Sequence, residues 1–541
     1  MQRSRAVAGC VIALFAASGV SQEHQHRTAE KLGAVHLATS CNEQAQKEFD
    51  RAVALLHSFQ FHDAIQGFNA ALKSDPGCGI AYWGIALSQW SNPFAMGMKD
   101  KNQLQAGREA AQRGKAAGAK TERERAYIAA ASELYKDFEN TPQQTRLLAY
   151  RDAMGNVAAQ YPEDREAQIF YALALSASEE PSDKTYTARL KAGAILEKLF
   201  REEPNHPGLA HYIIHAYDVP PLAERALNAA QRYSDIAPDA PHALHMPSHT
   251  FTRVGNWQES IDCNRAAAAA SRREGQAAEE LHASDYQMYA YLQTAQDQAA
   301  RKVLDSLPQM ASRFDPKVVV SGAAGPSAAY FALAAIPARY ALERGDWKSA
   351  SELQPRETPF PYADAMTWFA LGMGAARVHD VPKAQGSETA LLNIRARLEK
   401  ANEGYWAMQV EIQRLEVSAW AQFAQGQKDA ALTTMKSAAE MEDGTEKSAI
   451  TPGPLAPTRE LLGEMLLEMN EPAKSLAQFE ATLKKEPNRF RALYGAARAA
   501  QLSGNAEVSR KYFGTLLSLC RRADKPGRAE ILEARKAISQ N

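Results

Sequence analysis

The sequence has almost no net charge, and its body contains no long apolar segment. Its 541 residues carry 62 Lys and Arg against 63 Asp and Glu, which leaves a formal net charge of -1. Nucleic-acid-binding proteins concentrate positive charge to replace phosphate counterions, so this balance predicts no nucleic-acid partner. Beyond residue 21 no run of about 18 apolar residues occurs, which predicts no integral membrane segment after cleavage of a signal.

The common catalytic motifs are also missing. The chain contains no HExxH, GxSxG, GxGxxG or Walker loop, and no CxxC pair. These absences exclude the standard signatures of zinc proteases, α/β-hydrolases and nucleotide-binding enzymes, and a zinc site built from paired thiolates. The motifs therefore do not decide whether the protein is an enzyme.

The first residues predict an export signal. Arg3 and Arg5 precede an apolar run from Ala6 to Ala17, and small residues follow as far as Ser21. This is the pattern of a cleaved signal peptide over residues 1–21, and the run is too short to span a membrane well. We therefore expect the protein to be exported to the periplasm or the cell exterior.

Only five cysteines are present, and export changes how they are interpreted. Removal of the signal leaves Cys41, Cys78, Cys263 and Cys520 in a compartment that permits disulfides. Cys41 and Cys78 each precede one of two successive predicted helices, so a bridge between them is one interpretation and two free thiols the other. Cys263 lies in a helical run and is expected to be a small buried residue.

Strand patterns are almost absent, whereas helical periodicity runs through nearly the whole chain. In residues 45–78, Ala52, Leu55, Ala64, Phe68 and Pro76 have the offsets of a tetratricopeptide repeat, which spans about 34 residues. The same offsets recur near the C-terminus, and Gly255-Asn256-Trp257 and Gly345-Asp346-Trp347 mark equivalent turns. The predicted fold is an all-α, right-handed superhelical solenoid of tetratricopeptide-like hairpins with a concave inner face.

Breaks in the period divide the solenoid. They fall at 91–99, 178–185, 321–326, 354–361 and 448–457. We predict a signal peptide at 1–21, N-terminal repeats at 22–178, central histidine-rich repeats at 179–320, further repeats at 321–450 and C-terminal repeats at 451–541.

Histidines give the most specific signal in the chain. His211 and His215 are four residues apart, and His245 and His249 follow them by 34 residues, one repeat further on. Each pair is expected on one face of one helix, and the two helices on neighbouring repeats. Four imidazoles on one surface predict a site for Zn, Cu, Ni or Fe.

Further polar residues continue the same register. His282, Asp285 and Tyr289 follow His242, His245 and His249 by 40 residues, and Tyr286 lies between them. In tetratricopeptide repeats these positions line the concave groove, which implies a ligand groove containing His242, His282, Tyr286 and Tyr289. Asp285 is a candidate ligand or an orienting group for an imidazole.

Two other interpretations stay open for the histidines. They could form a polar or proton-dependent pocket, or they could only hydrogen-bond one another and the backbone. His57 and His62 flank the turn of the first repeat and are expected to be structural. Glu411 lies on an aromatic-rich helix and is expected to be an exposed carboxylate rather than a catalytic base.

Several stretches together resemble a known group of proteins. HPGLAHYIIHAYD (206–218), PHALHMPSHTFTRVGNWQESI (241–261) and TPGPLAPTRELLGEMLLE (451–468) resemble exported bacterial tetratricopeptide-repeat proteins with HxxxH-containing repeats. The resemblance implies the fold and the exported location but no reaction. It also implies a histidine after Lys447, where this chain has Ser448, which argues against a ligand from the C-terminal repeats.

Three functions are compatible with these features. The first is an exported scaffold whose groove takes a protein, a peptide or a small ligand. The alternative is a transition-metal protein, with hydrolytic or redox activity, that uses the paired histidines. A third, assistance to an assembly machine of the cell envelope, rests on fold analogy alone.

Overall fold

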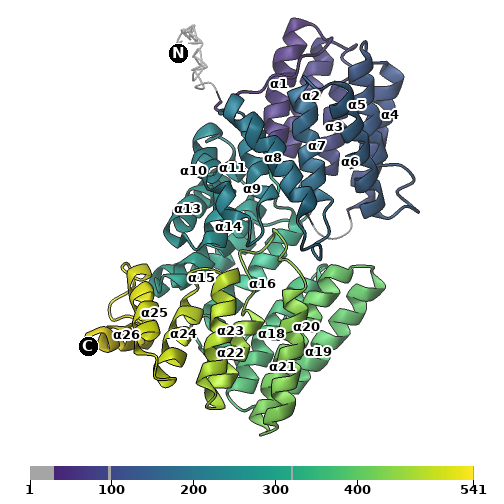
Figure 1. The fold of residues 1–541 in the computed structure, drawn as a ribbon. Helices are drawn as coiled ribbons and strands as arrows, with labels where there is room; N and C mark the ends of the chain where they lie inside the picture. Colours follow the sequence, from purple (N-terminus) through teal and green to yellow (C-terminus); the bar gives the residue numbers. More distant parts are fainter. Residues whose placement is uncertain (1–29, 96–98, 319–320, 540–541) are drawn as a thin grey trace, which may run out of the picture.

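The structure is a computed structural model that describes residues 30–95, 99–318 and 321–539. Within these ranges the chain is helical and contains no strand. Antiparallel helical hairpins stack into a right-handed superhelix (Figure 1), which confirms the predicted fold class. The predicted signal peptide lies outside the described residues.

The helices follow one another with short connections. The N-terminal part contains α1 (Glu43–His57), α2 (Phe61–Ser74), α3 (Ala81–Trp90), α4 (Lys101–Ala117), α5 (Glu122–Glu133), α6 (Gln143–Gln160), α7 (Arg165–Ala177) and α8 (Thr187–Glu202). The central part contains α9 (Pro207–Ala216), η1 (Ala223–Ala226), α10 (Leu227–Ile236), α11 (Pro241–His245), α12 (Pro247–Val254), α13 (Trp257–Arg273), α14 (Ala277–Gln293), α15 (Asp297–Arg313) and α16 (Pro326–Leu342). The remainder contains α17 (Trp347–Ser351), α18 (Pro361–Arg377), α19 (Val381–Lys400), α20 (Gly404–Ala424), α21 (Lys428–Asp443), α22 (Thr458–Glu468), α23 (Pro472–Lys485), α24 (Phe490–Leu502), α25 (Ala506–Leu519) and α26 (Ala529–Ser539).

Small residues allow neighbouring helices to pack closely. A Cβ atom on Gly84 would lie 2.2 Å from the ring of Phe68, and one on Gly495 would lie 2.3 Å from the ring of Phe479. Both glycines follow their phenylalanine by 16 residues, so the same contact recurs at the two ends of the chain. The repeat in the sequence therefore corresponds to a repeated packing contact in the structure. The predicted breaks all coincide with connections between helices.

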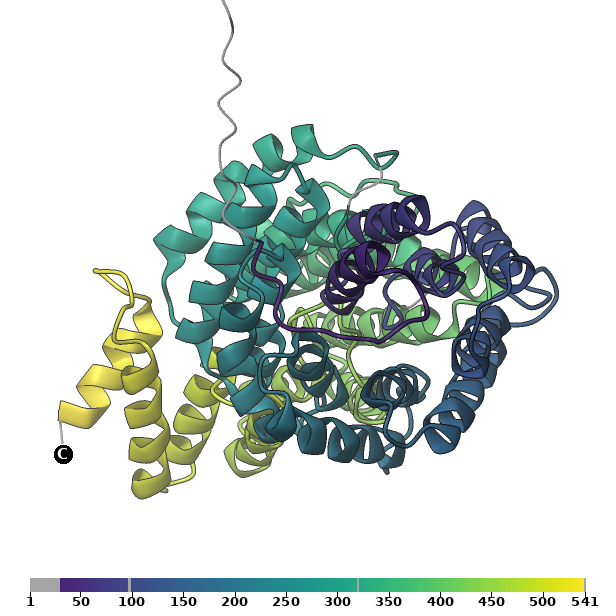
Figure 2. The ribbon, with the colours of Figure 1, turned by 90° about the horizontal axis from the view of Figure 1, so that it is seen from above.

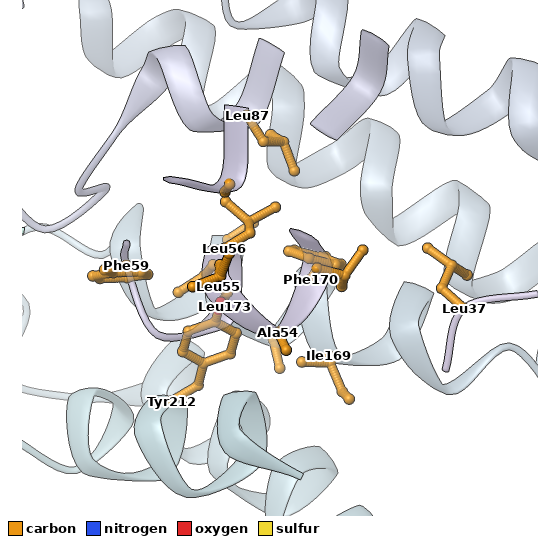
Figure 3. Close-up of a cluster of buried hydrophobic side chains, with 14 of the residues drawn as sticks. Leu37, Ala54, Leu55, Leu56, Phe59, Leu87, Ile169, Phe170, Leu173 and Tyr212 are labelled. Carbon is orange, nitrogen blue, oxygen red and sulfur yellow. The ribbon is translucent and has the colours of Figure 1, made fainter. Parts of the chain in front are cut away.

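The N-terminal core reaches the central helices. Phe49, Leu55, Phe59, Phe170 and Tyr212 are buried in one continuous cluster. Figure 3 shows Tyr212 extending from its helix toward the side chains of the α1 end. Phe59, in the turn between α1 and α2, has a left-handed φ of 55°. This turn places an aromatic ring against the central histidines.

The C-terminal repeats return to the middle of the chain. The Trp257 indole donates to the carbonyl of Asn488 at 2.8 Å, and Gln293 accepts from the amide of Phe490 at 2.9 Å. Gly255 has φ of 72°, and a Cβ there would lie 2.4 Å from the carbonyl oxygen of Pro487. Glycine is required at this position by both its backbone and this close approach. The superhelix thus closes on itself, with the last helices projecting from the ring (Figure 2).

Two further features bear on the sequence predictions. Cys41 and Cys78 are joined in a disulfide, with Cα atoms 4.9 Å apart. Cys263 is partly buried and Cys520 buried, and both are free. None of the described helices combines the length and apolarity needed to cross a bilayer.

Candidate metal centre

Four helices bring six histidines together. α9 carries His211 and His215, and the others come from α11, α12 and α14 (His242, His245, His249 and His282). Pro207 and Pro241 each begin a helix, which places the histidines in the predicted register. The helix expected to carry both His245 and His249 is instead interrupted, because Pro247 lacks an amide hydrogen and begins a new helix.

The histidines lie in the interior of the superhelix. Their exposed fractions range from 0% to 7%. An open groove lined by exposed imidazoles is therefore not what the structure shows. They form two trios whose ring nitrogens lie within 4.8 Å of one another: His211, His215 and His242 in the first trio, and His245, His249 and His282 in the second.

The second trio has hydrogen bonds that define its tautomers. Asn264 donates from Nδ2 to the carbonyl of Ser260 at 2.7 Å, so its Oδ1 is the atom 2.7 Å from His245 Nδ1. His245 Nδ1 must then carry the proton. His249 Nδ1 lies 3.1 Å from Asp218 Oδ2 and donates to that carboxylate. In each neutral ring the lone pair is consequently on Nε2.

These two lone pairs face each other. His245 Nε2 and His249 Nε2 are 3.1 Å apart. With no proton between them the contact is repulsive, and a cation between them makes it attractive. Two imidazole nitrogens on one zinc ion, at 2.0–2.1 Å each, are about 3.3 Å apart in a tetrahedral site. The observed distance therefore suits two ligands of one metal ion.

The first trio has the same character. His211 Nδ1 donates to the carbonyl of His57 at 2.6 Å, which leaves the lone pair on Nε2. His211 Nε2, His215 Nε2 and both nitrogens of His242 are buried without a protein hydrogen-bond partner among the described residues. Phe59 stacks on His215 and His242 and holds their planes. Buried polar atoms without partners require an explanation, and a bound ion or water is one when several of them converge.

Burial lowers the pKa of five of the six imidazoles and so favours their neutral form. It lowers the pKa of His211, His215 and His245 well below the usual range, and the neighbouring imidazoles lower it further. The pKa of His282 falls to about 3 for the same first reason, although Glu279 opposes the shift. The pKa of His249 is also lowered by burial, against the opposing effect of Asp218. Neutral imidazoles are the form that binds metal ions.

A small chamber lies between the trios. It has a volume of about 50 Å³, and its lining includes His215, His242, His249 and His282 together with Phe94, Met246, Trp406 and Ser448. Tyr286 donates to the carbonyls of Ala449 and Thr451 at 2.9 and 3.1 Å, which fixes the loop that covers the chamber. Trp406 also lines a larger cavity of about 580 Å³ on the other side of this loop.

Asp285 and Tyr289 bind arginines instead of the histidine group. Asp285 Oδ1 accepts from Arg339 Nε at 2.8 Å, and the same guanidinium donates to Thr451 and to the carbonyl of Gly453. Tyr289 accepts from Arg489 at 3.0 Å. Asp285 thus holds the covering loop through Arg339. Contrary to the expectation of an exposed carboxylate, the Glu411 side chain is only 16% exposed and pairs with Arg395 and Arg414.

A third cluster of metal-binding residue types is a satisfied hydrogen-bond network. Glu166 accepts from His57 Nε2 at 2.9 Å and from His206 Nε2 at 2.8 Å. The remaining ring nitrogens accept from the Tyr212 hydroxyl and from the amide of Leu209. Every ring nitrogen here has a protein partner, in contrast to the first trio, where four ring nitrogens have none among the described residues. The structural role predicted for His57 agrees with this network.

The residues that orient the candidate ligands were not predicted from the sequence. Asp218 follows His215 by three residues, and this spacing was an available signal. Asn264 and Phe59 lie on other elements, and nothing in their local sequence marks them. Asp218 is held by Arg253 at 2.8 Å and by Lys447 at 3.5 Å. Burial raises its pKa, but these cations and His249 override that effect and lower it well below the usual range.

No protein family and no curated protein match the sequence. Solved helical structures are similar at 13% identity. The match to a human IFIT1 dimer with m7Gppp-AAAA covers 90% of this chain and 96% of the IFIT1 chain, with a TM-score of 0.37. The match to yeast Tom70 covers 92% of this chain and 96% of the Tom70 chain, with a TM-score of 0.28. The match to the TPR domain of P58(IPK) covers 70% of this chain and 99% of that domain, with a TM-score of 0.20. At these TM-scores the similarity carries no argument about the function of this chain.

Proposed function

We propose that this protein is an exported helical-repeat protein that binds transition metal ions at two tri-histidine sites inside its superhelix. The observation that carries the proposal is the 3.1 Å distance between the Nε2 atoms of His245 and His249, which both have a lone pair. Hydrogen bonds to Asn264 and Asp218 fix the tautomers of the two rings. Hydrogen bonds from the distal ring nitrogen are the usual outer-shell arrangement of a metal-binding histidine. Three imidazoles and an open position suit zinc, copper, nickel or iron.

The surrounding structure supports enclosure rather than surface binding. Phe59, Phe94 and Trp406 shield the nitrogens from bulk water, and the covering loop is fixed by Tyr286 and Arg339. The disulfide between Cys41 and Cys78 supports an oxidising, exported location, as do the features of residues 1–21.

The test is the metal content of untagged protein purified without chelators, measured by elemental mass spectrometry. We expect one or two zinc, copper, nickel or iron ions per chain. A variant with His245→Gln and His249→Gln should lose metal, whereas His62→Gln, outside both trios, should not. Wild-type protein that contains no metal, and takes up none on reconstitution, would overturn the proposal.

A second candidate function is the binding of a partner segment or small ligand in the larger cavity. Its volume of about 580 Å³ lies in the usual range for ligand sites, and its lining includes Tyr186, Tyr405 and Trp406 with charges of both signs. Fluorescence titration of Trp406→Phe against the wild type would test whether a candidate ligand binds there. A ligand whose affinity is unchanged by alterations of all three aromatic residues would exclude this site.

A further inference from the structure

The six histidines form one continuous group. Ring centroids within the second trio are 4.5 Å apart for His245 and His282 and 5.1 Å for His245 and His249. Between the trios the centroids are 5.9 Å apart for His215 and His249 and 6.0 Å for His242 and His245. The separation between trios is close to the separation within them. Ions bound in the two trios would therefore be neighbours.

The shared chamber joins the two sites. Two histidines of each trio line it, and no charged side chain is among its lining residues. Catalytic metal pairs in proteins are typically about 3.5–4 Å apart with a small ligand between them. A chamber of about 50 Å³ admits a ligand of that kind and no larger substrate.

The charge of the surroundings selects among metals. Two divalent ions would place four positive charges among neutral imidazoles, and burying uncompensated charge is costly. Asp218 is the carboxylate next to the second trio, and Arg253 and Lys447 already neutralise it. Glu279 lies 3.9 Å from His242 Nδ1. Glu279 is buried beside His242 and His282 and compensates one positive charge, so two divalent ions leave a large excess of charge and two monovalent ions a small one. Cu(I) is the monovalent ion that imidazoles bind.

A soft sulfur donor also lines the chamber. Met246, between His245 and Pro247, is fully buried and lines the chamber. Thioether and imidazole groups both favour copper, and carboxylate and water sites favour Mg, Ca or Mn. The donor set on the chamber wall is therefore nitrogen with one sulfur and no thiolate.

We propose that the two trios together form a dinuclear copper centre, with one copper ion per trio, that binds dioxygen between the ions. This inference rests on the proposed metal-binding function and specifies its metal and ligand. The electron count balances without another reactant. Each Cu(I) gives one electron, O₂ accepts both and becomes peroxide, and no proton is consumed.

The experiment uses the full chain loaded with copper. We expect two copper ions per chain by elemental analysis. When loaded as Cu(II), the protein should give an electron paramagnetic resonance signal far below its copper content, or a half-field line, because neighbouring spins couple. The anaerobic Cu(I) protein should take up one O₂ per two copper ions.

Single-trio variants separate the pair from the individual sites. His242→Gln and His282→Gln each remove one ligand from one trio, and each should restore a full-intensity Cu(II) signal per bound ion. His62→Gln should behave as the wild type. Full-intensity signals without a half-field line in the wild type, one copper per chain, or no O₂ uptake would overturn the inference. If the wild type binds none of zinc, copper, nickel and iron, the proposed function itself fails instead.

Discussion

Replacing Asn264 with leucine should weaken the second trio without touching a ligand. Asn264 is fully buried on α13, accepts from His245 Nδ1 and is anchored by its own donation to Ser260. Leucine has a similar volume but no acceptor. His245 is then free to place its proton on either nitrogen, and in one tautomer Nε2 no longer has a lone pair to give a metal ion.

The expected magnitude follows from two separate losses. Loss of an outer-shell partner lowers metal affinity by about 10- to 100-fold in characterised sites. The metal-free protein also loses the acceptor for a buried ring nitrogen, which costs about 1–3 kcal/mol of unfolding free energy. Both effects should appear together, because the same hydrogen bond orients the ring and satisfies its proton.

The assay is a competition titration with a chromophoric chelator, beside denaturant unfolding of the metal-free protein. Ser271→Ala is the matched control, since Ser271 is buried on the same helix and donates only to the carbonyl of Ala267 at 2.9 Å. It should retain wild-type affinity. Wild-type affinity in a folded Asn264→Leu protein, or equal weakening in the control, would refute the assignment of Asn264 as the group that orients His245.

Three further predictions test neighbouring features. Glu166→Gln should lower the free energy of unfolding by about 1–3 kcal/mol, because the amide nitrogen would face an imidazole N–H donor where a carboxylate oxygen now accepts. The metal stoichiometry should not change. Loss of metal would contradict the separation of this cluster from the trios. Trp406→Ala should speed removal of bound metal by a chelator, measured by absorbance in a stopped-flow assay, because Trp406 lies between the chamber and the larger cavity. An unchanged rate would exclude the larger cavity as the path by which metal leaves. Glu416→Gln should stabilise the protein more as pH rises above about 4.5. Burial and then the nearby Glu442 raise the pKa of Glu416, so the folded state keeps a proton that the unfolded state releases, and wild-type stability falls by about 1.4 kcal/mol per pH unit in that window. A gain in the thermal midpoint that is the same at pH 5 and pH 8 would contradict this reasoning.

The repeat architecture could be predicted because it depends on local pattern. Pro207 and Pro241 begin helices where the period places them, and the five expected breaks are connections between helices. The same register correctly placed His211 and His215 one repeat before their equivalents. Helix starts, turns and periodicity all act within a few residues, so sequence offsets are enough to locate them.

The partners of the site could not be predicted in the same way. Asp285 shares the register of the histidines, but Arg339, 54 residues further on, takes its carboxylate. The closed chamber depends on a loop near Ala449 that reaches α14 only because the C-terminal repeats return to it. Such contacts depend on superhelix curvature, to which every hairpin contributes, and no single segment encodes it.

Closure of the superhelix bears on the proposed metal site, because it covers the histidines. An open solenoid leaves its inner face wet, and water competes for imidazole nitrogens. Here Arg489 is fully buried and pairs with Glu343 and Glu460 at 2.7 Å each, so the C-terminal repeats are fixed against the central helices. Removing one partner of such a buried pair costs about 3–5 kcal/mol. The loop over the chamber is therefore held in place because the C-terminal repeats are locked against the central helices, and the six imidazoles are brought together by contacts that lie far from them in the sequence.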